Sequence, residues 1–193
     1  AANVIPYLCD GATIQLGIGG VPDALGAMIA ESDLKDLGMH TEFATDAFYK
    51  LFAAGKITNR CKTRDRNKAV FGIGAGTQAL YDWIDWNPGV AAYPISYVND
   101  VNVVASIDNF ISLNSCVGID LYGQVSSESS GTRQISGTGG QVDFLTGAAK
   151  SKGGKAFICM SSTFTAKDGT VKSRIVPHFG GDIVTSPRSQ AYY

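Results

Sequence analysis

Short apolar runs alternate with amphipathic segments through the first half of the chain. The apolar runs at 12–16, 39–43 and 68–73 each have the length of a buried strand. Each is followed by a polar or glycine-rich loop and then by a segment with helical spacing. A strand, a loop and a helix thus recur three times, which predicts an α/β fold with a mostly parallel sheet flanked by helices.

Residues with known preferences for helix ends mark the predicted helices. Pro22 suits the first turn of the first helix, because its missing N–H is no loss there. Thr45 or Asp46 can cap the second helix, and Gly55 suits its C-terminal end. The third helix is expected within 74–89, which closes on an Asn-Pro-Gly sequence.

Segments in the second half are shorter and richer in β-branched residues. The predicted strands there lie within 107–113, 115–125, 155–161 and 170–179. Asp168-Gly169 is a good hairpin turn between the last two, and a helix is expected at Val142–Ala149. We therefore expect a β-rich second half that joins the first half on one sheet system, and a single domain over residues 1–193.

Composition and charge exclude several classes of function. The chain is 45% hydrophobic and 17% charged, as in ordinary globular proteins, and its formal net charge is −1. Its basic residues form no run longer than the scattered segment 60–66, so nucleic-acid binding is disfavoured. There is no signal peptide and no apolar run of roughly 18 residues, so we expect no membrane segment and a cytoplasmic location.

Cysteine and histidine usage argues against a metal site. The chain has four cysteines and two histidines. The cysteines lie far apart without a Cys-x-x-Cys pair, and two histidines cannot build a histidine-rich site. We predict no metal, and we expect Cys9, Cys61, Cys116 and Cys159 to be small buried apolar side chains.

The two ends of the chain have the character of interior sequence. Residues 1–11 look like the tail of a helix, and residues 189–193 look like the start of a strand. We therefore expect this chain to be a piece of a longer polypeptide.

A glycine loop at Gly17–Gly20 follows the first predicted strand and precedes a helix. This is the context of a phosphate or oxyanion site, because free N–H groups at a helix start attract anions. The dinucleotide pattern fails, since Pro22 stands where a third glycine is needed, and no Gly-Lys-Ser/Thr of a P-loop follows. A tight turn with a purely structural role stays open as the alternative.

Glu42 lies near the carboxyl end of the second predicted strand, just before a helix. Ligands gather at this edge of open α/β sheets, although a solvated glutamate at a strand end fits the same pattern. His40 alternates with Glu42 and is expected on the same face of the sheet, where a structural role is the more frequent one.

A second glycine loop, within 137–144, also precedes a helix. Two such loops can present backbone donors to two parts of one extended anionic ligand. Glu128 is a rival carboxylate, and Asn99 is a polar loop residue without a strong signal of its own. The residues alone favour an enzyme with an anionic ligand and do not name its reaction.

Four motifs together resemble one family. They are DGATIQLGIGGVPDAL at 10–25, HTE at 40–42, NSCVGIDLYGQVSSES at 114–129 and ISGTGGQVDF at 135–144. The sequence is similar to the acetyl-CoA hydrolase/transferase family, which includes 4-hydroxybutyrate and butyryl-CoA:acetate CoA-transferases. The resemblance implies a CoA-transferase (NagB/RpiA-like) fold, and a chain that is the C-terminal domain of a two-domain, homo-oligomeric subunit.

The same resemblance assigns roles to individual residues. Glu42 is implied to be the nucleophile, in preference to Glu128. Residues implied to contact CoA or to line its channel are Gly17, Ile18, Gly19, Gly20, Val21, Asn99, Val117, Gly139 and Gly140. No cofactor is implied, since the CoA thioester is a substrate. The implied partners of the chain are acyl-CoA, short-chain carboxylic acids and the missing N-terminal domain.

The leading hypothesis is therefore a CoA-transferase that works through a glutamyl-CoA thioester. An acyl-CoA hydrolase that uses the same glutamate stays open, as does a domain that binds CoA or a nucleotide without turnover. The sequence does not fix the acyl group, and we expect this chain alone to have weak or no turnover.

Overall fold

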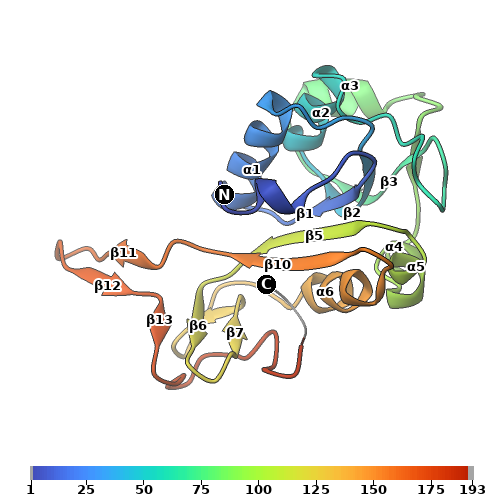
Figure 1. The fold of residues 1–193 in the computed structure, drawn as a ribbon. Helices are drawn as coiled ribbons and strands as arrows, with labels where there is room; N and C mark the ends of the chain where they lie inside the picture. Colours follow the sequence, from blue (N-terminus) through green and yellow to red (C-terminus); the bar gives the residue numbers. More distant parts are fainter. Residues whose placement is uncertain (1, 191–193) are drawn as a thin grey trace.

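Six parallel strands form the central sheet, in the order β10-β5-β1-β2-β3-β4 (Figure 1). The computed structural model describes residues 2–190, so part of the strand expected at 189–193 lies outside the described residues. The strands are β1 (Thr13–Leu16), β2 (Gly38–Ala44), β3 (Ala69–Gly74), β4 (Val90–Ala92), β5 (Phe110–Ser115) and β10 (Lys155–Cys159). The predicted parallel α/β sheet is confirmed.

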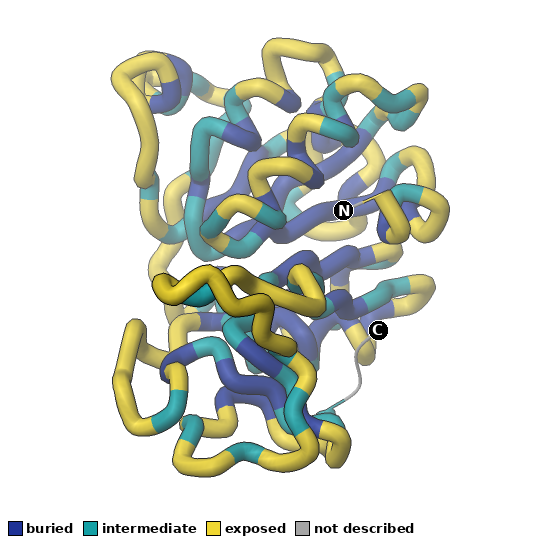
Figure 2. The backbone as a smooth tube through the Cα atoms, turned by 90° about the vertical axis from the view of Figure 1, so that its left-hand side faces the viewer, coloured by how far each residue is buried: buried dark blue, intermediate teal, exposed yellow. Residues whose placement is uncertain are grey.

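Three helices cover one face of this sheet, as the repeated pattern predicted. They are α1 (Gly20–Glu31), α2 (Asp46–Ala53) and α3 (Gln78–Ile84). Each buries apolar residues three or four positions apart, such as Leu25 and Ile29 on α1, against strand residues such as Leu16 and Leu113. Figure 2 shows the buried positions concentrated along the strands and the inner sides of these helices.

Helix ends were predicted with mixed success. Pro22 lies in the first turn of α1, and Gly55 follows α2 with a φ of +71°, as expected. Thr45 stands at the N-cap of α2, but its side chain makes no capping hydrogen bond. Asp46 instead accepts hydrogen bonds from Thr77, ahead of α3, so its carboxylate links two loops at the edge of the sheet.

The opposite face of the sheet is covered by three other helices (Figure 1). They are α4 (Ile95–Val98), α5 (Val101–Ala105) and α6 (Gln141–Lys150). The predicted α6 is confirmed. The sequence did not predict α4 and α5, because elements of four and five residues are too short to show helical periodicity.

The second half of the chain is rich in strands, as predicted, but the expectation of one sheet system was wrong for most of them. Among the described residues, β5 and β10 are the strands of this half that join the central sheet. The short strands β6 (Gly118–Asp120), β7 (Val125–Ser126), β8 (Ser129–Ser130), β9 (Arg133–Gln134), β11 (Thr163–Thr165), β12 (Val171–Ser173) and β13 (Ile175–Val176) form three small separate sheets. The expected turn at Asp168-Gly169 does join β11 to β12, in a hairpin that projects from the molecule in Figure 1.

The structure also tests the expectations for the cysteines and for the start of the chain. Cys9 and Cys61 are exposed, so the prediction of buried cysteines was wrong for these two, while Cys116 and Cys159 are partly buried. Near the start of the chain, Ile5–Tyr7 form a single 3-10 turn. Within residues 2–190, no helix has both the length and the apolar character needed to cross a membrane.

His40 lies at the centre of the core between the sheet and α4–α6. Its ring is fully buried and lies 6.0 Å from the ring of Phe110 and 6.4 Å from that of Phe144. Its Nε2 donates a hydrogen bond to the Val98 carbonyl oxygen at 2.8 Å, and Nδ1 has no partner among the described residues. Burial lowers the pKa of His40 from 6.5 to about 4, so the ring is neutral at physiological pH.

This pKa predicts an acid-sensitive fold. Between pH 6.5 and 4 the unfolded chain binds a proton on His40 that the folded chain rejects, so stability falls as the pH falls through this window. The loss from this residue amounts to about 3 kcal/mol and is complete below pH 4. His40→Gln cannot titrate, so urea unfolding of this variant should show a smaller loss of stability between pH 7.5 and 4.5. An equal loss in both proteins would contradict the assignment.

Candidate active site

Glu42 projects from β2 towards the face of the sheet that carries α4–α6. It alternates with Met39, Thr41 and Phe43 along the strand and shares the face of His40, as the sequence predicted. β2 lies between β1 and β3, and Glu42 is near its carboxyl end. Its side chain is partly buried, so the carboxylate is sheltered by protein and still reachable.

The second glycine loop meets Glu42 directly. The Gly140 N–H donates a hydrogen bond to Glu42 Oε2 at 2.8 Å, across 98 positions of sequence. Gly140 is the N-cap residue of α6, so the carboxylate lies at the positive end of this helix. The expectation that Gly140 forms a wall of the site is consistent with this contact.

Asn99 lies at the same point. A Cβ atom on Gly140 would lie 2.5 Å from Glu42 Oε2 and 2.4 Å from Asn99 Nδ2, so only glycine leaves room for both groups. Gly139 has a φ of +54°, and a Cβ there would lie 4.0 Å from Glu42 Oε2. Glu42, Asn99, Gly139 and Gly140, all singled out from the sequence, are therefore brought together.

Hydrogen bonds on both sides of Asn99 hold it in place. His40 binds the carbonyl of Val98, the residue just before it. Asp100, just after it, caps α5 by accepting from the N–H groups of Asn102 at 2.7 Å and Val103 at 3.0 Å. The Asn99 Oδ1 atom is buried and has no hydrogen-bond partner among the described residues, so an acceptor remains available at the site.

Two neighbours of Glu42 were missed from the sequence. Asp143, in the first turn of α6, has a raised pKa because of burial and the negative charges of Glu42 and Asp100. Gly72 lies beside Glu42 on β3, as the register of the flanking residues shows, and a Cβ on it would lie 2.3 Å from Ile95 Cδ1. The apolar side chain of Ile95 therefore covers Gly72. Asp143 lies within the motif at 135–144, whereas no sequence pattern around Ile95 indicates a place near the site.

The first glycine loop lies at the same edge of the sheet and makes different contacts. Extending the β1–β2 register places Gly17 opposite Glu42. The Gly17 N–H donates to the Leu113 carbonyl oxygen at 2.7 Å, and a Cβ on Gly17 would lie 2.9 Å from Asn114 Oδ1. Gly19, with a φ of +123°, starts α1. This loop therefore contacts β5, and Ile18 between the glycines is 58% exposed.

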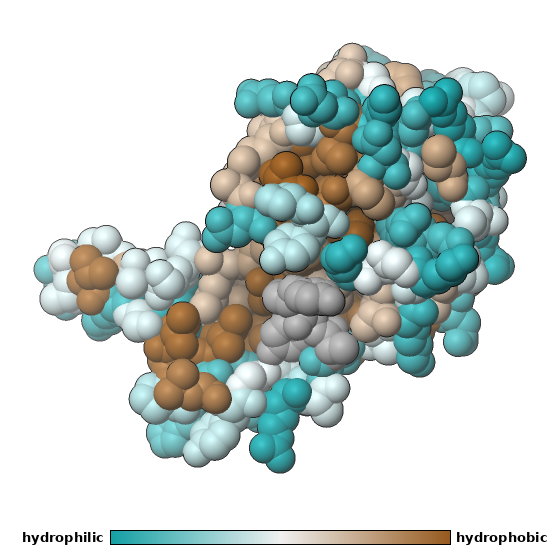
Figure 3. Space-filling view, in the orientation of Figure 1, coloured by the Kyte–Doolittle hydropathy of each residue, from teal (hydrophilic) through white to brown (hydrophobic). Residues whose placement is uncertain are grey.

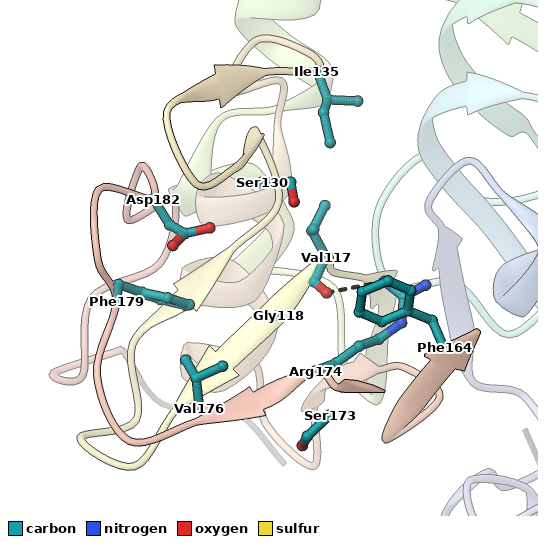
Figure 4. Close-up of a pocket in the computed structure, with 10 residues that line it drawn as sticks. All are labelled: Val117, Gly118, Ser130, Ile135, Phe164, Ser173, Arg174, Val176, Phe179 and Asp182. Atoms are coloured by element: carbon teal, nitrogen blue, oxygen red, sulfur yellow. Dashed lines mark hydrogen bonds between the residues drawn. The ribbon is translucent and has the colours of Figure 1, made fainter. Parts of the chain in front are cut away.

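The structure places the last two candidates beyond the immediate contacts of Glu42. Val117 donates its N–H to the Ser126 carbonyl and lines a cavity of about 300 Å³ with Phe164 and Phe179 (Figure 4). Glu128 is almost completely buried and accepts a hydrogen bond from Thr138 Oγ1 at 3.3 Å. Glu128 thus braces the second glycine loop, which agrees with its expected place near the site.

Two known proteins with similar sequences are CoA-transferases by name. The chain is 54% identical to the butyryl-CoA:acetate CoA-transferase of Anaerostipes caccae and 48% identical to the 4-hydroxybutyrate coenzyme A transferase of Clostridium kluyveri. The alignments cover 100% and 99% of this chain and 44% of each relative. The chain thus spans less than half the length of these relatives.

Solved structures agree with the fold. RipA from Yersinia pestis matches with a TM-score of 0.89 and 38% identity, over 98% of this chain and 42% of RipA. The 4-hydroxybutyrate CoA-transferase of Porphyromonas gingivalis matches with a TM-score of 0.78 and 39% identity, over 93% of this chain and 42% of that one. Residues 76–193 match the family described as "Acetyl-CoA hydrolase/transferase C-terminal domain". This chain therefore belongs to the acetyl-CoA hydrolase/transferase family.

Proposed function

We propose that this chain is the catalytic domain of a CoA-transferase, which moves CoA between a short-chain acyl-CoA and a carboxylic acid with Glu42 as the nucleophile. The observation that carries the proposal is the placement of the Glu42 carboxylate against the Gly140 N–H, with the Asn99 side chain at the same point. The names of the relatives support the reaction class.

The proposed reaction has two acyl transfers in each half. A Glu42 oxygen attacks the thioester carbonyl, and the C–S bond breaks. CoA then leaves as a thiolate, and an acyl–glutamyl anhydride remains on the enzyme. The thiolate then attacks the glutamyl carbonyl, which releases the first acid as a carboxylate and leaves a glutamyl-CoA thioester. An acceptor carboxylate reverses these steps and departs as the new acyl-CoA.

The residues around Glu42 supply what a weak nucleophile needs. Gly140 holds Oε2 in place, which leaves Oε1 to attack. When the thiolate attacks the glutamyl carbonyl, negative charge develops on the oxygen that Gly140 contacts, and Asn99 Nδ2 lies beside it. The loop Gly17–Val21 and Val117 are proposed to line the path of CoA to this point, as the family resemblance implies.

Several parts of the proposal concern the whole protein. Because the chain spans 44% of its relatives, we infer that an N-terminal domain completes the pocket and, with it, the specificity for the acyl group. The protein is proposed to need no cofactor, since CoA enters as a thioester substrate, and to act in the cytoplasm as a homo-oligomer.

Hydrolysis is the second candidate. Proteins named acetyl-CoA hydrolase, such as that of Kluyveromyces lactis, are 29% identical over 70% of this chain. Water in place of the acceptor acid would capture the same intermediates. Incubation with acetyl-CoA alone and with acetyl-CoA plus butyrate distinguishes hydrolysis from transfer. Release of free CoA at the same rate with and without butyrate would establish the hydrolase.

Glu42→Gln should abolish covalent capture of CoA. The amide keeps the size of the side chain and loses its charge, so the fold should persist while the nucleophile is lost. Mass spectrometry of the enzyme containing this chain, after treatment with acyl-CoA, should show a CoA-sized adduct on Glu42 in the wild type and none in the variant. A matched Glu128→Gln variant should retain the adduct. A folded wild-type enzyme without an adduct would favour a domain that only binds its ligand.

Gly140→Ala should lower kcat more than it changes affinity. The added Cβ would lie within 2.5 Å of Glu42 Oε2, so the carboxylate must move away from its donor. The loss of one oxyanion donor costs roughly 10²- to 10³-fold in rate. Gly137→Ala is the control, because a Cβ at that position meets no atom within 4 Å. Equal kcat values for the two variants would exclude Gly140 from the reaction centre.

A further inference from the structure

A second cavity lies at the carboxyl edge of the sheet, where β1 and β5 are neighbours. It has a volume of about 180 Å³. Its walls include Gly20 and Val21 after β1, Ser115 at the end of β5 with Cys116 after it, and Ser161 after β10. β1 leads into α1 on one face, whereas the chain after β5 leads through the small sheets to α6 on the other. Such a switch point is where open α/β sheets bind ligands.

Arg174, which follows β12 in the projecting hairpin, reaches this cavity. Its guanidinium lies 5.1 Å above the ring of Phe164, and its Nη1 donates a hydrogen bond to the Val117 carbonyl at 3.0 Å (Figure 4). Its Nε is buried and has no acceptor among the described residues, and none of their carboxylates forms an ion pair with it. The guanidinium of the partly buried Arg174 thus lines the cavity without a carboxylate partner among the described residues, and an anionic ligand in the cavity would supply one.

Arg174 lines both the 180 Å³ cavity and the 300 Å³ cavity of Figure 4, and the two differ in charge. Asp182 stands in the wall of the larger cavity and disfavours an anion there. No Asp or Glu of the described residues lines the smaller one. Burial raises the pKa of the Cys116 thiol to about 12, so this wall carries no negative charge at neutral pH.

The β11–β12 hairpin, which Arg174 follows, stands out from the body of the molecule (Figure 3). Its exposed apolar residues include Val171 and Phe164. Phe164 holds the flat face of the guanidinium, and Val117 holds one of its nitrogens. These contacts leave the remaining donors of the fork for a ligand. Arginine is suited to such a role because its planar fork matches the oxygens of carboxylates and phosphates.

We propose that Arg174 binds an anionic oxygen group of a substrate in the 180 Å³ cavity, either a phosphate of CoA or the carboxylate of the free acid. The inference rests on the proposed function and extends it. The volume is about six times the roughly 30 Å³ share of one liquid water, enough for a carboxylate or phosphate group with some of its hydration. Glu42 stands on β2, next to β1, so one substrate can reach both positions along the same sheet edge.

The test compares three variants of the enzyme that contains this chain. Arg174→Met removes the charge, Arg174→Lys keeps the charge and loses the fork, and Lys172→Met removes an equal charge from an exposed position of the same hairpin. Arg174→Met should raise the KM of the anionic substrate by about 10- to 100-fold, Arg174→Lys by less, and Lys172→Met by under about 2-fold. Thermal unfolding confirms that each variant is folded.

Substrate choice identifies the source of the anion. If a CoA phosphate binds, the KM for acyl-CoA rises and the KM for the acyl-pantetheine thioester, which lacks phosphates, does not. If the acid binds, the KM for butyrate rises while that for acyl-CoA is unchanged. Arg174 variants that match Lys172→Met with every substrate would overturn the proposal. Should the wild type show no CoA transfer, the proposed function fails, and calorimetric titration with CoA and with butyrate still decides whether Arg174 binds an anion.

Discussion

The hydrogen bond from the Gly140 N–H to Glu42 Oε2 joins the two halves of this chain at its candidate reaction centre. One partner is fixed by the central sheet and the other by the start of α6. The position of α6 is set in turn by Phe144, Leu145 and Ala148 in the core beneath the sheet. It is also set by Gly147, where an added Cβ would lie 2.5 Å from the side chain of Val104 on α5. The chemistry of Glu42 therefore depends on how closely helices pack several residues away.

This contact has two opposing effects on a nucleophile. An N–H at a helix start stabilises the carboxylate before it reacts, and only an interaction that is stronger in the transition state raises the rate. Asp143 and Asp100 act in the other direction, because their negative charge disfavours a further charge nearby. The pKa of Asp143 is raised first by burial and then by the negative charges of Glu42 and Asp100. On the proposed mechanism, the attack moves charge off Glu42 and towards CoA. The negative charges of the same aspartates then favour the reaction. The Gly140 N–H stays hydrogen-bonded to the oxygen that becomes negative in the next step.

The sequence predicted the elements that have enough residues to show a period. β1–β3, α1–α3 and α6 follow from apolar runs and helical spacing. Strands of two or three residues, such as β8 and β9, and the helices α4 and α5 are below that length, so the small sheets and the support of Asn99 were missed. No local sequence pattern predicts the hydrogen bond between Gly140 and Glu42. Only the family resemblance indicated that both residues belong to one site. Arg174 was missed for a related reason, since its significance lies in its place on the wall of a cavity that no described Asp or Glu lines, and not in its neighbours along the chain.

Water exclusion is the remaining physical requirement of the proposed transfer. An anhydride or a glutamyl thioester persists long enough to meet an acceptor acid only if water is kept from it. In this chain the sheet and the start of α6 shelter one side of Glu42, and Ile95 on α4 covers Gly72 on the adjoining strand. Glu42 itself remains partly exposed, and Ile18 on the adjoining loop is 58% exposed. The choice between transfer and hydrolysis therefore depends on whichever surface covers Ile18 and the open side of Glu42 during turnover. On the proposed mechanism, Glu42 is the nucleophile and Gly140 and Asn99 supply its donors, and that covering surface decides which acceptor reaches them.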